Sequence, residues 1–531
     1  MADLALLPRP TSLRRGDGRL TLPSRLAASG PPEWVDTFRA LVSPGSGIAV
    51  DATTDDERAT LRINEIAGAP GSYDLTVDDS GITLTAADRA GLCHGIATLR
   101  QLLPPWACGA APGSADPVTL PHVQVHDAPH FAWRGLLLDV GRHFQPLDSL
   151  LRLVDLLALH KLNVLHLHLT EDHGWRFEVR ALPRLTTVGA VRPETRLPAW
   201  ETGDGTPHGG FYTQSQLRSL VAYAALRGVT VVPEIDLPGH VRSLLAAYPE
   251  FGDPGAEPTT VATTVGVFPE VLHLSDATVA TVETVLTELL DVFPSEFIHV
   301  GGDECPRGQW ESSAAAAEVA ADHGLPGVHG LQPWFTAHLR DWLAARGRRL
   351  VGWDEIIDEG PLAGAVVMSW RGAGPGARAI AAGNDVVLCA PPYYLDHHQS
   401  SGPDEPYGIG GLATWQDVLT TDPYAAVPAA DRPRLLGIQG QLWTEYLPTP
   451  RQVDYMAWPR AAALAEVAWS GPGNDAWSGP GDGGPVVEEF EGRLRVHLAR
   501  LDAMGVDYRP LDGPHSWQVG GTGRWTRVDH P

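Results

Sequence analysis

The sequence has little cysteine. Its four cysteines lie far apart in 531 residues, and no two of them form a Cys-x-x-Cys pair. A disulfide framework or a structural zinc site needs several cysteines at short spacings. The sequence therefore predicts neither; the four side chains are Cys93, Cys108, Cys305 and Cys389.

Positive charge and long apolar runs are also scarce. The chain has 39 lysines and arginines against 64 acids, a net charge of −25, which argues against nucleic acid or an anionic membrane as a partner. No apolar run approaches a membrane span, and the first residues lack the basic-then-apolar pattern of a secretory signal. We expect a cytoplasmic protein whose partner is a small molecule.

The rest of the composition is that of an ordered globular protein, with 43% hydrophobic and 19% charged residues. At 531 residues the chain is too long for one ordinary domain, but a barrel with insertions and a small companion would fill it. Tryptophan is unusually abundant, at 17 residues. Its flat apolar face suits a sugar ring, although core packing is the ordinary role of most tryptophans.

Residues 1–128 have the pattern of a small α+β domain with an antiparallel sheet. Apolar residues alternate on both sides of a turn at 78–81, which indicates a hairpin with one buried face. Asp88 is placed to cap a helix whose apolar residues recur at helical spacing until Pro104. Residues 104–126, rich in Pro, Gly and Ala, have the composition of a connector.

From residue 129 the pattern changes to strands alternating with amphipathic helices. Eight such strands predict a (β/α)₈ catalytic barrel over residues 129–510, followed by a C-terminal tail at 511–531. Asp148 is expected to cap the first helix, whereas residues 376–382 are too few for a full helix between the sixth and seventh strands. The expected strands are residues 135–140, 163–169, 229–235, 297–300, 350–353, 366–370, 385–389 and 435–442.

A Gly/Pro-rich loop at residues 471–485 precedes the last helix that the pattern predicts. Phe490, Leu494 and Leu501 would share one face of that helix, which we expect to be buried.

Carboxylates or aromatic side chains follow nearly every predicted strand. Barrel enzymes place their chemistry at these C-terminal strand ends. A ring of acids, an arginine and flat apolar faces suits a polyhydroxylated substrate, which needs bidentate hydrogen bonds and stacking. The strand ends read 139–143 (DVGRH), 171–172 (ED), 234–240 (EIDLPGH), 303–304 (DE), 353–355 (WDE), 370–371 (WR), 394–396 (YLD) and 443–445 (WTE).

The acid pair Asp303-Glu304 is the centre of this ring. It follows a strand-like run and two glycines, Gly301 and Gly302, which allow close approach of backbone or substrate. Adjacent carboxylates repel each other, which raises the pKa of one of them and provides a proton donor beside an anion. The alternative is an ordinary acidic surface turn, which the other strand ends make less attractive.

These motifs together resemble the family 20 glycoside hydrolases, the β-N-acetylhexosaminidases. The resemblance covers the whole predicted barrel in order, and the first domain resembles that family's small α/β domain at 91–103 (GLCHGIATLRQLL). It implies an exo-acting, retaining enzyme that releases terminal β-linked GlcNAc or GalNAc, for example from chitooligosaccharides. The matching segments are 134–144 (RGLLLDVGRHF), 166–172 (HLHLTED), 233–240 (PEIDLPGH), 299–304 (HVGGDE), 352–355 (GWDE), 394–396 (YLD), 443–445 (WTE) and 456–466 (MAWPRAAALAE).

The resemblance also implies a role for each matched residue. Glu304 would be the general acid and then the base, while the substrate's own 2-acetamido oxygen attacks the anomeric carbon to form an oxazolinium ion. Asp303 would orient the acetamido N–H, and Tyr394 would donate to its oxygen. Glu171 and His240 match a relay behind Glu304, although many members carry Asp at the position of Glu171.

The remaining matched residues would bind the sugar. No cofactor and no metal is expected, and the sequence leaves the oligomeric state open. The expected contacts are Trp334, Trp353 and Trp443 around the acetyl methyl, Arg142 and Glu445 at ring hydroxyls, Asp396 as a further polar contact, and Trp415 at the aglycone side.

Three other interpretations remain open. His166 and His168 alternate on one strand and so share a face, as metal ligands do in metal-dependent amidohydrolases, although we favour packing and hydrogen-bonding roles. A sugar-binding protein without activity would explain the tryptophans but would not require the acid pair. A two-carboxylate retaining glycosidase would use Asp303 or Asp354 as its nucleophile.

Overall fold

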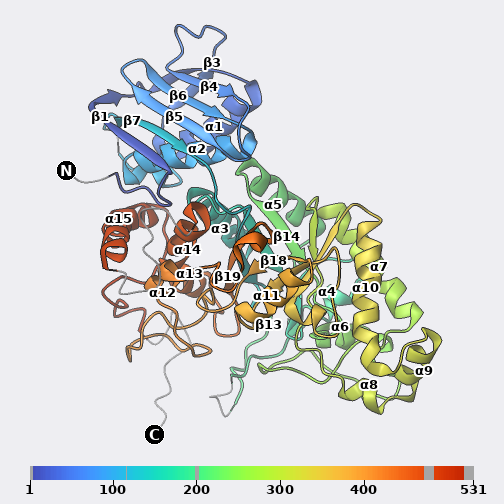
Figure 1. Ribbon diagram of the computed structural model, residues 1–531. Coiled ribbons are helices and arrows are strands. Elements are labelled where there is room, and N and C mark those ends of the chain that lie inside the picture. Colours follow the sequence, from blue (N-terminus) through green and yellow to red (C-terminus); the bar gives the residue numbers. More distant parts are fainter. Residues whose placement is uncertain (1–3, 115, 198–201, 472–483, 520–531) are drawn as a thin grey trace.

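The computed structural model describes residues 4–114, 116–197, 202–471 and 484–519. Its N-terminal part is a seven-stranded sheet in the order β1-β7-β5-β6-β4-β2-β3, with α1 and α2 packed against it (Figure 1). The elements are β1 (Ser12–Thr21), β2 (Arg25–Ser29), α1 (Pro32–Ser46), β3 (Ala49–Ala52), β4 (Leu61–Glu65), β5 (Tyr73–Asp78), β6 (Gly81–Ala86), α2 (Arg89–Leu102), the 3₁₀ turn η1 (Pro105–Cys108) and β7 (Thr119–Asp127).

Local sequence explains the antiparallel part of this sheet, but the sheet is mixed and not antiparallel throughout as expected, because β4 pairs in parallel with β2 and β6. Strands β5 and β6 form the expected antiparallel hairpin, with Val77 opposite Ile82 and one face of each strand buried. The Asp88 side chain accepts a hydrogen bond from the Gly91 N–H at 2.7 Å, which confirms it as the cap of α2. The connector is more ordered than its composition suggests, because β7 spans its last part and pairs with β1 and β5.

Eight parallel strands close into a barrel in the order β14-β15-β16-β17-β18-β19-β8-β9, which confirms the predicted (β/α)₈ fold. The sequence located all eight strands, with ends within two residues of those observed. They are β8 (Trp133–Asp139), β9 (Val164–His168), β14 (Thr230–Glu234), β15 (Phe297–His299), β16 (Arg349–Trp353), β17 (Val366–Ser369), β18 (Asp385–Leu388) and β19 (Leu435–Leu442).

Two expectations about the barrel helices are wrong. Asp148 does not cap the first helix: the N-cap is Pro146, and Asp148 lies in the first turn, where its charge favours the helix N-terminus. The sixth and seventh strands are joined by a helix after all, because it begins at Ala373, soon after the strand ends. The helices around the barrel are α3 (Leu147–Leu159), α5 (Gln214–Leu226), α7 (Asp276–Val292), α10 (Leu331–Ala344), α11 (Ala373–Ala381) and α14 (Arg460–Ser470).

Shorter elements extend the loops at the barrel's mouth and sides. No helix in the described ranges combines the length and the apolar character needed to cross a bilayer. These elements are β10 (Thr170–Glu171), β11 (Gly174–Trp175), α4 (Arg184–Thr187), β12 (Val191–Arg192), β13 (His208–Gly209), α6 (Arg242–Ala247), η2 (Pro249–Phe251), α8 (Gly308–Ser312), α9 (Ala314–Asp322), η3 (Val328–Gly330), η4 (Asp354–Ile357), α12 (Trp415–Thr420), η5 (Ala429–Arg434) and α13 (Pro450–Ala457).

The last helix, α15 (Gly484–Ala503), buries Phe490, Leu494 and Leu501 as expected. It also ties the N-terminus to the barrel, because Arg493 donates to the Leu6 carbonyl at 2.9 Å and pairs with Glu466 at 2.8 Å. Most of the predicted loop at 471–485, and residues 520–531 of the predicted tail, lie outside the described residues.

Candidate active site

The acid pair follows a sharp turn at the end of β15. Gly301 and Gly302 have φ values of 69° and 100°, and Glu304 itself has a φ of 43°. A Cβ at Gly301 would lie 1.7 Å from Oδ1 of Asp236, so a side chain at that position would collide. The glycines therefore do what the sequence predicts: they let the chain turn closely and present both acids at the mouth of the barrel.

Asp303 is the more buried acid, with 13% of its side chain exposed. Its Oδ1 is buried and has no hydrogen-bond partner among the residues that the structure describes. Burial, together with the negative charges of Glu234 and Glu304, raises the pKa of Asp303, although His240 opposes the shift. The unpaired oxygen is an acceptor that a ligand can use.

Glu304 is 38% exposed, and its Oε2 lies 3.5 Å from Nε2 of His240. The interaction with His240 lowers the pKa of Glu304, against the effect of its partial burial. One pKa of the acid pair is raised, as expected. It is that of Asp303 and not of Glu304, because Asp303 is more deeply buried, with 13% of its side chain exposed against 38% for Glu304.

His240 lies behind both acids and is itself buried. Its Nδ1 is 3.0 Å from Oε1 of Glu171 and 3.0 Å from Oδ2 of Asp172. Burial alone would lower the pKa of His240, but Glu171 and Asp172 outweigh it and raise the pKa well above its usual value. The sequence named Glu171 as the relay partner and missed Asp172.

Arg142 lies among acids and an indole ring at the mouth of the barrel. Its guanidinium forms an ion pair with Glu171, lies 3.5 Å from Asp139 and 4.0 Å from Glu445, and sits over the Trp443 ring at 5.0 Å. Its Nε is buried without a hydrogen-bond partner in the described chain. The structure therefore brings Arg142, Glu445 and Trp443 together, as the strand ends predict.

Tryptophan side chains form the apolar side of the site. Trp353 and Trp443 lie with ring centroids 5.6 Å apart, and Nε1 of Trp353 donates to Oε1 of Glu234 at 2.9 Å. Trp370, which belongs to the predicted ring of strand ends but was given no substrate contact, packs against the same barrel-interior cluster as these two rings. Its position directly after β17 was the signal for it, because polar or aromatic residues follow the other strands as well.

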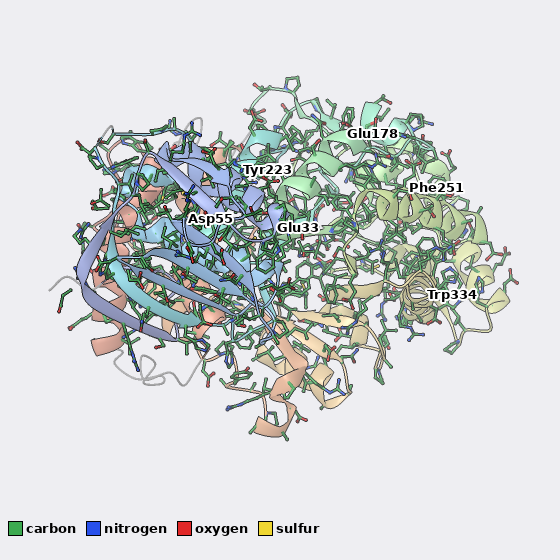
Figure 2. All side chains as sticks on the ribbon, turned by 90° about the horizontal axis from the view of Figure 1, so that it is seen from above. Glu33, Asp55, Glu178, Tyr223, Phe251 and Trp334 are labelled. Atoms are coloured by element: carbon green, nitrogen blue, oxygen red, sulfur yellow. The ribbon has the colours of Figure 1, made fainter. Side chains whose placement is uncertain are left out.

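Two predicted contacts are wrong. Trp334 lies on the outer helix α10 (Figure 2). Its ring stacks on His323 with ring centroids 4.0 Å apart and does not join Trp353 and Trp443. Trp415 is 8% exposed and packs on Phe490 of α15, which makes it a core residue and not an aglycone contact. Spacing in the sequence could not reveal which way either ring turns.

Tyr394 and Asp396 follow β18. The Tyr394 hydroxyl donates to the Trp370 carbonyl at 2.9 Å, and Asp396 is buried with an unpaired Oδ1 within the described ranges. Burial and the repulsion of Glu445 raise the pKa of Asp396 well above its usual value. Burial also raises the pKa of Glu445, against the attraction of Arg142.

Three histidines below the site gather around Glu234, and one of them, His168, forms a hydrogen bond with it. His168 Nδ1 and His166 Nε2 lie 2.5 and 3.0 Å from Oε2 of Glu234, and His299 Nδ1 lies 2.8 Å from its Oε1. Gln439 Nε2 donates to Nδ1 of His166 at 3.0 Å. One ring nitrogen of His166 and one of His168 thus take part in hydrogen bonds, as the packing interpretation predicts, and His166, Glu234 and His299 also lie close enough together to hold an ion.

The two acids that follow β16, Asp354 and Glu355, are also held by hydrogen bonds. Asp354 pairs with the Arg371 guanidinium, and its Oδ2 accepts the Trp370 and Arg371 N–H groups at 2.8 and 3.1 Å, so it is not free to act as a nucleophile. Glu355, which the sequence did not single out, accepts from Trp370 Nε1 at 2.9 Å. Burial and the nearby Asp303 raise the pKa of Glu355 to about 8.

Comparison with known families matches both parts of the chain. Residues 131–472 match the model of the glycosyl hydrolase family 20 catalytic domain, and residues 3–128 match that of domain 2 of the same family. The two matches together account for most of the sequence.

Individual proteins agree with this. The chain is 37% identical to a β-hexosaminidase of Porphyromonas gingivalis over 82% of its own length but only 54% of that protein's. It is 32% identical to a β-N-acetylhexosaminidase of Cellulomonas fimi over 95% of its length and 96% of that protein's. The fold is similar, with a TM-score of 0.81 and 28% identity, to an exo-β-N-acetylglucosaminidase of Vibrio harveyi solved with N-acetylglucosamine, over 96% of this chain and 78% of that one.

Proposed function

The chain belongs to glycosyl hydrolase family 20, as a β-N-acetylhexosaminidase, and from this premise we propose that it releases terminal β-linked N-acetylhexosamine by substrate-assisted catalysis. The reaction is exo-acting and retains the anomeric configuration. The nucleophile is the acetamido oxygen of the substrate, which attacks the anomeric carbon and forms an oxazolinium ion. Water then opens that ion.

The unpaired Oδ1 of Asp303 is the observation that carries the proposal. It is a buried acceptor directly before Glu304 at the mouth of the barrel, and an acetamido N–H would supply the donor that it lacks. A carboxylate there orients the acetamido group and balances the positive charge that develops on its nitrogen. Because the pKa of Asp303 is raised, the N–H donor also offsets part of the cost of ionising it.

Glu304 supplies the proton to the leaving oxygen and later accepts one from water. In the free protein its pKa is lowered by His240, so it is not poised as an acid. A bound sugar covers the 38% of the side chain that is exposed and removes water from it. Desolvation favours the neutral form, which raises the pKa toward that of a general acid.

Tyr394 donates to the acetamido oxygen during the attack. A phenol has one hydrogen, and in the free protein that hydrogen is given to the Trp370 carbonyl. The hydroxyl therefore turns from the backbone to the substrate on binding. Trp353 and Trp443, with Trp370 in the place expected for Trp334, enclose the acetyl methyl.

The ring hydroxyls are held by Arg142, Glu445 and Asp396. One buried atom of Arg142 and one of Asp396 have no hydrogen-bond partner in the described part of the chain. A sugar hydroxyl can accept a hydrogen bond from Arg142 and donate one to Asp396. The guanidinium presents two parallel N–H groups, which match a pair of adjacent hydroxyls.

A panel of aryl β-glycosides tests the proposal. The GlcNAc or GalNAc glycoside should be hydrolysed, whereas the plain glucoside, which lacks the internal nucleophile, should react far more slowly. A thiazoline analogue of the oxazolinium ion should inhibit strongly, because it resembles the species that the site stabilises. Equal rates on the glucoside and the acetamido sugar would contradict the mechanism.

A further inference from the structure

Two adjacent acids face the relay histidine, but only one of them bonds to it well. Both Oε1 of Glu171 and Oδ2 of Asp172 lie 3.0 Å from Nδ1 of His240. Only Asp172 meets the angle of a hydrogen bond, and Oε1 of Glu171 makes none within the described residues. A hydrogen bond depends steeply on angle, so equal distances do not mean equal partners.

Asp172 is fixed from a second side. Its Oδ1 accepts the N–H of Arg242, the first residue of α6, at 2.9 Å, while its Oδ2 receives His240. The side chain is 1% exposed. The carboxylate therefore links the turn between β10 and β11 to the loop that carries His240, and it leaves the imidazole one orientation.

The orientation of the His240 imidazole decides what its other ring nitrogen, Nε2, faces. With Nδ1 held by Asp172, Nε2 of His240 points between the two catalytic acids, 3.5 Å from Oε2 of Glu304 and 3.7 Å from Oδ2 of Asp303. A carboxylate that fixes Nδ1–H sets both the tautomer and the direction of Nε2.

Glu171 is engaged elsewhere. Its Oε1 forms an ion pair with Nη2 of Arg142, and its Oε2 accepts the backbone N–H of Asp172. Gly141 makes room for this arrangement, because a Cβ there would lie 2.6 Å from the Cβ of Glu171. The side chain is therefore tied to the sugar-binding arginine as well as to its own backbone.

We propose that the two neighbouring acids divide the work: Asp172 positions His240 and thereby Glu304, while Glu171 holds Arg142 for the sugar. This inference rests on the proposed function. It assigns Asp172 a role in the relay, where the resemblance places its neighbour Glu171. The glutamate's reach toward Arg142 explains why the shorter adjacent acid bonds to the histidine.

Kinetics of Asp172→Asn and Glu171→Gln separate the two roles. Both variants keep size and remove charge, and the substrates are a GlcNAc disaccharide and an activated aryl GlcNAc glycoside. Asp172→Asn should lower kcat on the disaccharide by roughly 10- to 100-fold, a part of what acid–base catalysis supplies, with a much smaller loss on the aryl glycoside. Glu171→Gln should raise KM on both substrates by about tenfold, because Arg142 loses a charged partner.

A double-mutant cycle with His240→Gln shows whether Asp172 acts through the histidine. Asp172→Asn should add little to the kcat loss of His240→Gln, because both act through the same imidazole. Glu171→Gln should still raise KM in the His240→Gln background, because that effect passes through Arg142. Melting temperatures and binding of free GlcNAc check that each variant is folded. If Asp172→Asn does not fold, Glu171→Gln alone decides, since a kcat loss that depends on the leaving group would overturn the assignment.

The outcomes also separate this inference from the proposed function. Exchanged phenotypes, with Glu171→Gln lowering kcat and Asp172→Asn raising KM, would overturn the division of roles but leave the enzyme a hexosaminidase. A wild-type protein that hydrolyses the plain glucoside as fast as the acetamido sugar would overturn the substrate-assisted mechanism instead.

Discussion

Two clusters of buried charge differ in how completely their atoms are paired. One lies where the N-terminal sheet meets the barrel. There Oδ2 of Asp127 accepts from Lys161 Nζ at 2.7 Å and the Tyr73 hydroxyl at 2.8 Å, and its Oδ1 accepts from Trp469 Nε1 at 2.9 Å and the Thr11 N–H at 3.0 Å. Each oxygen of this carboxylate has at least two donors.

The cluster at the mouth of the barrel is left incomplete. Asp303, Asp396, Arg142 and His240 each keep one buried polar atom without a hydrogen-bond partner in the residues described. Leaving such an atom unpaired costs about 1–3 kcal/mol, so an incomplete cluster persists where a ligand completes it. The comparison separates charge that stabilises the fold from charge that is kept for a substrate.

The largest expected effect is at Glu304. Replacing it with Gln keeps the shape and removes the ionisable proton, so hydrolysis of a disaccharide should fall by ~10²–10⁴-fold, the range of general acid–base catalysis. The first step on an activated aryl glycoside needs little protonation and should suffer much less. Rates across a series of leaving groups measure the difference.

Asp303→Asn is the matched control for Glu304→Gln. It removes the partner of the acetamido N–H, so good and poor leaving groups should lose rate alike. Azide should partly rescue Glu304→Ala by replacing water in the second step and should do little for Asp303→Asn. A parallel loss in the two variants across the leaving-group series would show that the assigned roles are wrong.

A substitution in the cluster around Asp127 should lower stability and leave catalysis unchanged. Lys161→Met leaves Asp127 buried without its cation, which should lower the free energy of unfolding by about 3–5 kcal/mol. Lys161 lies just before β9 begins, at the end of the barrel away from the mouth, so kcat and KM of the folded protein should not change. Denaturant unfolding beside steady-state kinetics measures both; a loss below about 1 kcal/mol, as for an exposed pair, would contradict the assignment.

The sequence predicts the barrel well because its signals are local. Alternating strands and amphipathic helices locate all eight strands, and the glycines before Asp303 indicate the tight turn that Gly301 makes against Asp236. The sequence pattern is enough to predict features that depend on the backbone, such as a strand, a helix or a tight turn. Residues at strand ends converge on the mouth of any such barrel.

Side-chain direction is what the sequence does not contain. Trp334 and Trp415 have the right type and order, yet one stacks on His323 and the other on Phe490. Asp172 and Glu171 are adjacent, and only the geometry at His240 distinguishes them. These outcomes depend on packing between segments far apart in the chain, which no local pattern fixes.

Arg142→Lys tests the incomplete cluster through its cation. The planar guanidinium can engage two adjacent hydroxyls, whereas an ammonium is a single point of charge. Loss of one charge-assisted hydrogen bond is worth about 1.5–3 kcal/mol, so KM should rise by at least about tenfold although the charge is kept. Unchanged kinetics would place Arg142 outside the site.

Asp396→Asn should give the smallest change in the free energy of unfolding, and the direction of that change distinguishes the two kinds of cluster. Burial, and then the repulsion of Glu445, raise the pKa of Asp396 in the folded protein, so the folded state favours its protonated form. Stability contributed by this group is therefore present at low pH and is lost as the pH rises from the unfolded value of about 4 toward the raised folded pKa. At neutral pH the fold bears a cost at this carboxyl, either in burying its charge or in taking up a proton, and Asn removes that cost, so the variant should gain about 1 kcal/mol of unfolding free energy while losing activity. Melting curves at acid and neutral pH check this, since the gain should vanish in acid; a variant less stable than the wild type at neutral pH would show that Asp396 is paired for stability, like Asp127, and not kept for a sugar.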